Sequence, residues 1–85
     1  MYKMKFFVYI LESKIDNSFY IGQTSNIEER IVSHNKGYNR STKSKRPWKV
    51  IYTEECSSRS EAMKLEKKIK SWKKRDVIKG YIGKK

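Results

Sequence analysis

Two apolar runs near the N-terminus have the alternation of a pair of β-strands. Residues 5–11 are apolar on both faces of an extended chain, which is typical of a central strand covered on two sides. Residues 12–18 are polar and contain Asp-Asn-Ser, which has the chemistry of a tight turn. Residues 19–22 form a second short apolar run, so we expect an antiparallel hairpin.

The register of this hairpin decides where its two tyrosines point. A four-residue loop at residues 14–17 pairs Tyr9 with Gly22. In the same register Leu11 pairs with Tyr20, so the two tyrosines lie diagonally on one face, within reach of a shared ligand. A slip of one residue would put the phenols on opposite faces of the sheet.

Two segments with helical features follow the hairpin. Ser25 has a glutamate three positions on, and this capping box predicts a helix that ends near Gly37. Ser58 repeats the spacing ahead of a longer helix, expected to run to about residue 74. The apolar positions of the longer helix form one buried stripe of Ala62, Leu65, Ile69 and Trp72.

A polar loop and a third strand separate the two helices. Residues 38–46 are basic and without periodicity, and Pro47 ends this loop. Residues 48–53 alternate as a strand does. Three of its side chains are expected to share a face: Trp48, Val50 and Tyr52. Residues 76–82 predict a further short helix.

The order of these elements is β-β-α-β-α, with the short helix at the end. It predicts the α+β class, with a three-stranded antiparallel sheet flanked by helices. A length of 85 residues corresponds to one domain, so we expect a single domain over residues 1–85.

The charge of the chain narrows the choice of partner. The formal net charge is +12, from 21 Lys and Arg against 9 Asp and Glu. Such an excess repels itself in a folded protein and is most simply explained by a polyanionic partner. We expect nucleic acid, DNA in preference to RNA, over an anionic membrane surface or a merely solubilising charge.

The loop before the third strand is the candidate for phosphate contacts without base specificity. A solvated loop without a ligand is the alternative. Its cations are Arg40, Lys43, Lys45, Arg46 and Lys49.

Cysteine and apolar content bear on the compartment. The single cysteine, Cys56, excludes an internal disulfide and fits a reducing compartment. No apolar run approaches the ~20 residues that a membrane span needs. We therefore expect a cytoplasmic protein that stays out of the membrane.

Glu66 is a carboxylate within a very basic helix. It can form a solvated ion pair with Lys70, four positions on. It can also serve as a hard-oxygen ligand for Mg²⁺ or Mn²⁺. One carboxylate suffices in principle, because magnesium keeps most of its waters and takes further oxygens from substrate phosphate.

Arg30 and His34 are one helical turn apart on the first predicted helix. Arg30 is either an ordinary surface arginine or a fork that grips a phosphate. His34 is either a hydrogen-bonded surface residue or a group that orients a phosphate or relays a proton. Tyr9 and Tyr20 are either ordinary aromatic residues of the strands or a catalytic pair, in which one phenol takes a proton from water. In the catalytic case a nearby metal or cation must lower the pKa of that phenol from its usual value of about 10.

Taken in order, these residues resemble the GIY-YIG nuclease superfamily. Val8-Tyr9-Ile10 looks like its first signature, with valine in place of the glycine, and Tyr20-Ile21-Gly22 is its second signature intact. The likeness runs from Phe6 to about Lys73 and is greatest to the small stand-alone branch. Further matching segments are Gly22-Gln23-Thr24, Glu29-Arg30 with His34-Asn35, Arg46-Pro47-Trp48-Lys49-Val50, Ser60-Glu61-Ala62 and Leu65-Glu66-Lys67.

The resemblance implies a metal-dependent endonuclease with the fold predicted above. By this likeness Tyr9 and Tyr20 are paired tyrosines, one of them the base for the attacking water. Arg30 stabilises the phosphate, with His34 as an auxiliary group, and Glu66 holds a single divalent metal. We expect the two phenols to lie on the same face as Arg30 and Glu66. We expect structured or single-stranded DNA as substrate. The alternatives are a nucleic-acid-binding module with little cleavage and an RNA-associated accessory protein.

Overall fold

The computed structural model describes residues 5–84, which form three strands, three α-helices and one short 3-10 turn. The elements are β1 (Phe6–Ser13), β2 (Phe19–Thr24), α1 (Ile27–Asn35), the 3-10 turn η1 (Lys43–Lys45), β3 (Trp48–Cys56), α2 (Arg59–Trp72) and α3 (Arg75–Gly83). This order confirms the predicted α+β class and the C-terminal helix. None of the helices within residues 5–84 is long and apolar enough to span a bilayer.

The sheet has β1 at its centre, antiparallel to β2 on one side and to β3 on the other. Tyr9 lies opposite Gly22 and Leu11 opposite Tyr20, which confirms the predicted register. The rings of Tyr9 and Tyr20 therefore lie on one face, with their centroids 6.3 Å apart.

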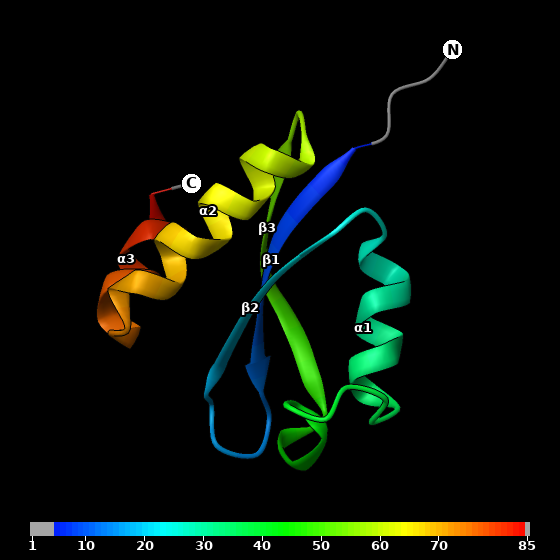
Figure 1. The fold of residues 1–85 in the computed structure, drawn as a ribbon. Helices are drawn as coiled ribbons and strands as arrows, with labels where there is room; N and C mark the ends of the chain where they lie inside the picture. The colour runs from blue at the N-terminus through cyan, green and yellow to red at the C-terminus, as the bar shows by residue number, and fades with distance from the viewer. Residues whose placement is uncertain (1–4, 85) are drawn as a thin grey trace.

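Helices cover both faces of the sheet, with α1 on one side and α2 and α3 on the other (Figure 1). Val8 and Ile10 of β1 are fully buried in the core on the α2 face. Tyr9, Leu11 and Trp48 form the core on the α1 face. Burial on two sides explains why the pattern of β1 is apolar on both faces.

β3 departs from simple alternation. Ile10 pairs with Tyr52, but the next residue of β1 pairs with Val50, so Ile51 is the extra residue of a bulge. The prediction that Tyr52 shares a face with Trp48 and Val50 is therefore wrong. Val50 packs in the core on the α1 face, whereas Tyr52 packs in the core on the α2 face.

The helix caps agree with the predicted spacing, with one shift of position. Ser58 caps α2 and accepts a hydrogen bond from the Glu61 backbone N–H at 3.1 Å. The cap of α1 is Asn26, whose Oδ1 accepts from the Glu29 backbone N–H at 3.1 Å, and not Ser25. Both positions carry a good capping residue with a glutamate three residues on, so the sequence alone does not choose between them.

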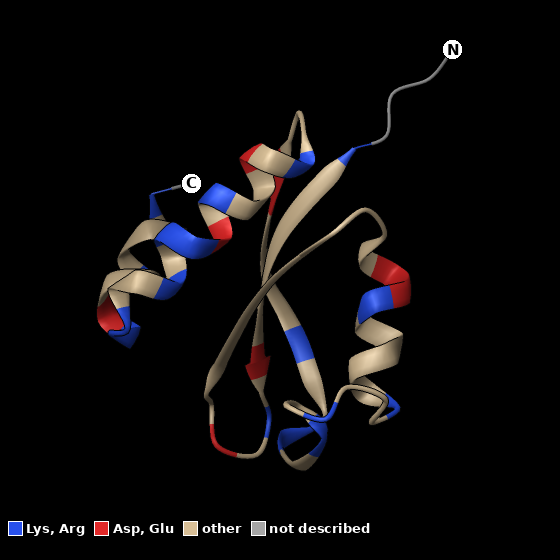
Figure 2. Cartoon of the chain, in the orientation of Figure 1, with Lys and Arg blue, Asp and Glu red and all other residues tan. Residues whose placement is uncertain are grey.

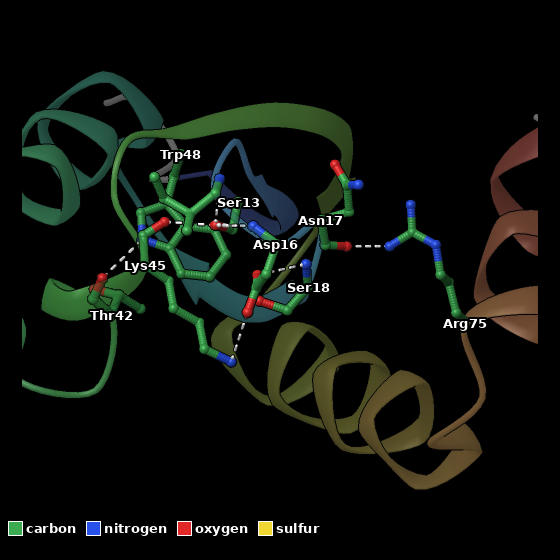
Figure 3. Close-up of polar contacts among 9 residues, drawn as sticks. Ser13, Asp16, Asn17, Ser18, Thr42, Lys45, Trp48 and Arg75 are labelled. Atoms are coloured by element: carbon green, nitrogen blue, oxygen red, sulfur yellow. Dashed lines mark hydrogen bonds and ion pairs between the residues drawn. The ribbon is translucent and has the colours of Figure 1, made fainter.

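Arg75, the first residue of α3, ties this helix to the hairpin. Its guanidinium donates to Glu12 Oε2 at 2.5 Å and lies 4.3 Å from the centroid of the Phe19 ring. It also donates to the Asn17 carbonyl (Figure 3). The hydrogen bond from Arg75 holds the pKa of Glu12 below its usual value. The hairpin turn and α3 thus form one unit beside the edge strand β2.

Candidate active site

Tyr9 lies at the centre of the candidate site. Its side chain is 2% exposed and extends across Gly22 of the neighbouring strand β2. A Cβ on Gly22 would lie 2.5 Å from the Tyr9 hydroxyl oxygen, so no other residue fits there without displacing the phenol. Since β2 is an edge strand, this glycine lets the hydroxyl reach towards the edge of the sheet.

His34 is fully buried behind this phenol and is not a surface residue. Its Nε2 is 3.1 Å from the Tyr9 hydroxyl, and its Nδ1 is 2.8 Å from Thr42 Oγ1. The Tyr20 ring packs edge-on against the imidazole, with the centroids 4.8 Å apart. Contacts on three sides hold the ring of His34 in one orientation.

The hydrogen bonds around His34 favour one tautomer of its neutral form. Thr42 Oγ1 also lies 3.4 Å from the Asn39 carbonyl, which accepts the hydroxyl proton. Thr42 Oγ1 therefore accepts from Nδ1–H of His34, which leaves Nε2 free to accept from Tyr9. Burial, together with the charge of Arg30, lowers the pKa of His34, so the imidazole is neutral at pH 7.

Thr42 is fully buried, although the sequence analysis does not identify it as a site residue. It stands in a polar loop without periodicity, so no local pattern marks it. Its carbonyl also accepts from Trp48 Nε1 at 2.9 Å, which anchors the loop to the start of β3 (Figure 3).

Burial and three charged or polar groups set the pKa of the Tyr9 hydroxyl. Burial raises this pKa most, and Tyr20 and Glu66 raise it further, whereas Arg30 lowers it. The phenol is protonated at neutral pH, and His34 Nε2 is the group in contact with its proton.

Glu66 lies on α2, which covers the face of the sheet opposite to α1 (Figure 1). The two phenols pack on the α1 face, so the prediction that they share a face with Glu66 is wrong. The carboxylate is partly buried and lines a shallow hollow with Gln23, the residue that follows Gly22 in β2. Lys70 Nζ lies 2.6 Å from Glu66 Oε2, so the ion pair allowed by the sequence is formed. The structure therefore brings Tyr9, Tyr20 and His34 together on the α1 side of the sheet, where Arg30 also lies, and leaves Glu66 on the α2 side.

Among residues 5–84, no group of three or more His, Cys, Asp and Glu side chains could hold a metal ion. A magnesium site needs fewer, since one carboxylate suffices when water and substrate phosphate complete the octahedron. Glu66 fits that description, because it is a hard-oxygen donor and its side chain is 22% exposed. A divalent ion there would share the carboxylate with Lys70.

Three cations of the loop that follows α1 surround an open hollow, namely Arg40, Lys43 and Arg46. Gly37 ends α1 with φ +80, as predicted, and any side chain there would collide with the Arg46 guanidinium. The loop is therefore folded tightly against the end of α1.

The other two cations of this region form ion pairs with the hairpin. Lys45 Nζ lies 3.3 Å from Asp16 Oδ2, and Lys49 Nζ lies 3.8 Å from Glu12 Oε1. Ser13 Oγ also donates to the Lys45 carbonyl at 2.6 Å (Figure 3). Lys45 thus joins the loop to the turn of the hairpin, whereas Lys49 lies in β3, and not in the loop as predicted, and is paired with Glu12 of β1. Figure 2 shows Lys and Arg on this loop and again on α2 and α3.

The tautomer of His34 provides a test of the hydrogen-bond chain. In Thr42→Val the Nδ1–H of His34 loses its acceptor, so we expect the proton to move towards Nε2, at a cost of about 1–3 kcal/mol in the free energy of unfolding. The ¹⁵N chemical shifts of the imidazole report this change directly. Thr42→Ser keeps the hydroxyl and should keep the wild-type shifts, and an unchanged tautomer in Thr42→Val would contradict the chain.

Comparison with known proteins places the chain in a family. Residues 5–82 match the GIY-YIG catalytic domain. A UPF0213 protein of Staphylococcus haemolyticus is 45% identical over 76 residues, which cover 88% of this chain and 92% of that protein. One from Desulfotalea psychrophila is 41% identical over 78 residues, which cover 86% of this chain and 70% of that protein. The solution NMR structure of a UPF0213 protein from Bacillus halodurans has a TM-score of 0.62 at 32% identity, and the match covers 96% of this chain and 86% of that one. Because the family model matches nearly its whole length and its fold is that of a solved relative, the chain belongs to the GIY-YIG nuclease family.

Proposed function

We propose that the protein is a metal-dependent endonuclease that hydrolyses phosphodiester bonds in structured or single-stranded DNA. One observation carries this proposal. The buried hydroxyl of Tyr9 is hydrogen-bonded to a neutral histidine while the opposite charges of Arg30 and Glu66 act on it. A protonated phenol next to a proton acceptor, under the electrostatic influence of a cation and a carboxylate, is suited to activating water beside a phosphate.

Tyr9 and His34 would move the proton. The raised pKa of Tyr9 means that a free phenolate is not the resting state. As the Tyr9 oxygen takes a proton from water, its own proton passes to His34 Nε2 along the 3.1 Å contact. Of the paired tyrosines, Tyr9 is therefore our choice for the general base, and Tyr20 positions His34 by ring packing.

Arg30 and Glu66 would act on the phosphate. The exposed guanidinium of Arg30 is free to bind the phosphate oxygens and to stabilise the charge that grows on them. Glu66 would hold Mg²⁺ or Mn²⁺, and a bound ion supplies neutralisation of phosphate charge and a lower pKa for attacking water. The loop cations Arg40, Lys43, Lys45 and Arg46, with Lys49 of β3, would hold the DNA backbone.

A binding module without cleavage is the second candidate, and one observation favours it. Lys70 already neutralises Glu66 at 2.6 Å, as a lysine in a purely structural pair would.

The test is cleavage of end-labelled single-stranded, branched and duplex DNA with Mg²⁺ or Mn²⁺, against the same reactions in EDTA. We expect metal-dependent cutting of the unpaired or branched substrates, and affinity that falls steeply with salt because phosphate contacts release counterions. Binding without cutting under either metal would establish the second candidate instead.

A further inference from the structure

A hollow of about 590 Å³ lies between the turn of the hairpin and the junction of α2 with α3. Residues 16–21 line one side of it, and Lys70, Lys73 and Arg75 line the other. Figure 3 shows the turn and Arg75 facing each other across this region. We call it the turn–α3 hollow. It adjoins the candidate active site, because Tyr20 lines it and Lys70 is paired with Glu66.

Lys73 has an unusual backbone conformation in this hollow. It is the C-cap of α2 and has φ 58 and ψ −18, in the left-handed region. Residues with a Cβ are disfavoured there, and glycine or asparagine is the usual choice at the end of a helix. A lysine at such a position has a conformational cost that glycine would avoid, which points to a use for its side chain.

The other charges of the turn–α3 hollow are engaged. Arg75 is held by Glu12 and by the Asn17 carbonyl, so it builds the wall of the hollow. Asp16 forms an ion pair with Lys45, and Lys70 forms one with Glu66. Lys73 is exposed and forms no ion pair with any residue in the range 5–84. It is therefore the cation of this lining that is available to an incoming anion.

We infer that the turn–α3 hollow binds one nucleotide of unpaired DNA next to the scissile bond, with Lys73 on its phosphate. This inference rests on the proposed nuclease function and specifies its substrate class. The volume falls in the range of about 300–1,000 Å³ found for pockets that hold one small molecule, which suits a single nucleotide. The preferred substrates would be single strands, flaps and branch points whose strand is unpaired on the α3 side of the cut.

Lys73→Gly separates binding from stability, because the two should change in opposite directions. Glycine removes the left-handed strain, so the midpoint of thermal unfolding should rise. It also removes one phosphate contact, so affinity for single-stranded DNA should fall, and the slope of log affinity against log salt should fall by about 0.7. Lys68→Ala is the matched control, since Lys68 is exposed on the same helix and lies outside the hollow.

We expect Lys68→Ala to keep the wild-type slope. If Lys73→Gly and Lys68→Ala lose the same affinity, the loss reflects net charge and the inference is overturned. A more stable Lys73→Gly protein with wild-type affinity overturns it as well.

A binding map distinguishes failure of this inference from failure of the proposed function. The probe is a short phosphorothioate single strand without metal, followed by backbone amide shifts in ¹⁵N-labelled protein. Shifts at Asn17, Lys70 and Lys73 with the single strand, and not with a duplex, support the inference whether or not the wild type cuts DNA. Shifts confined to residues 40–49, in a protein that does cut, overturn the inference and leave the nuclease function intact.

Discussion

Glu66→Gln is expected to lower the rate of DNA cleavage by at least about a hundredfold while DNA affinity stays close to wild type. Losses of this order follow when one group that stabilises transition-state charge is removed. Glutamine keeps the shape of the side chain and an oxygen on it, but its neutral amide is a much poorer ligand for a divalent ion. Single-turnover cleavage measured across a Mg²⁺ titration checks the expectation, with binding measured separately in EDTA.

A Lys70 variant is the control, because Glu66 could also serve only to form the ion pair with Lys70. An exposed pair four residues apart on a helix contributes only about 0.3–0.5 kcal/mol. In Lys70→Gln no ammonium group competes for the carboxylate, so half-maximal cleavage should need less Mg²⁺ than in the wild type. If Glu66 served only the ion pair, the two variants would behave alike, and equal cleavage by Glu66→Gln and wild type would remove Glu66 as the metal ligand.

The parts of the fold that follow from local patterns could be predicted from the sequence. The turn chemistry and alternation of the hairpin gave the register that puts Tyr9 over Gly22 and beside Tyr20. The bulge at Ile51 could not be predicted, since Val50, Ile51 and Tyr52 are all apolar and an inserted residue among them looks the same as continued alternation. The cap at Asn26 was ambiguous because Ser25 offers the same chemistry one position earlier.

The site residues named by the sequence come from four elements, but their connections are tertiary. No spacing along the chain relates Thr42 to His34, because the loop that carries Thr42 lacks periodicity. The left-handed conformation of Lys73 at the end of α2 is also absent from the sequence pattern, which predicts a helix to about residue 74. These contacts depend on how α1, the loop and α3 pack around the sheet, which a local pattern does not contain.

Tyr9→Phe is the other change with a large expected effect, a loss of cleavage of about 10²–10⁴-fold, the contribution typical of a positioned acid–base group. Tyr20→Phe is the matched control, since it removes a hydroxyl from the neighbouring strand and keeps the ring that packs on His34. We expect the smaller loss for Tyr20→Phe. A larger loss for Tyr20→Phe than for Tyr9→Phe would assign the general base to Tyr20. Tyr9→Phe also leaves His34 Nε2 without its donor, at about 1–3 kcal/mol, so rates must be compared where both variants are fully folded.

The pH dependence of cleavage distinguishes a proton relay from a purely structural contact between Tyr9 and His34. His34 can accept the Tyr9 proton only while its Nε2 is unprotonated, so the wild-type rate should fall as the pH drops through the pKa of His34. Burial and Arg30 lower that pKa from 6.5, so the decline should begin below the pH at which a free histidine titrates and the rate should be level above it. Rates of the wild type and of Tyr9→Phe measured from neutral to acid pH check this expectation. If the residual activity of Tyr9→Phe keeps the same acid decline, His34 acts on the reaction without Tyr9, and the relay is wrong.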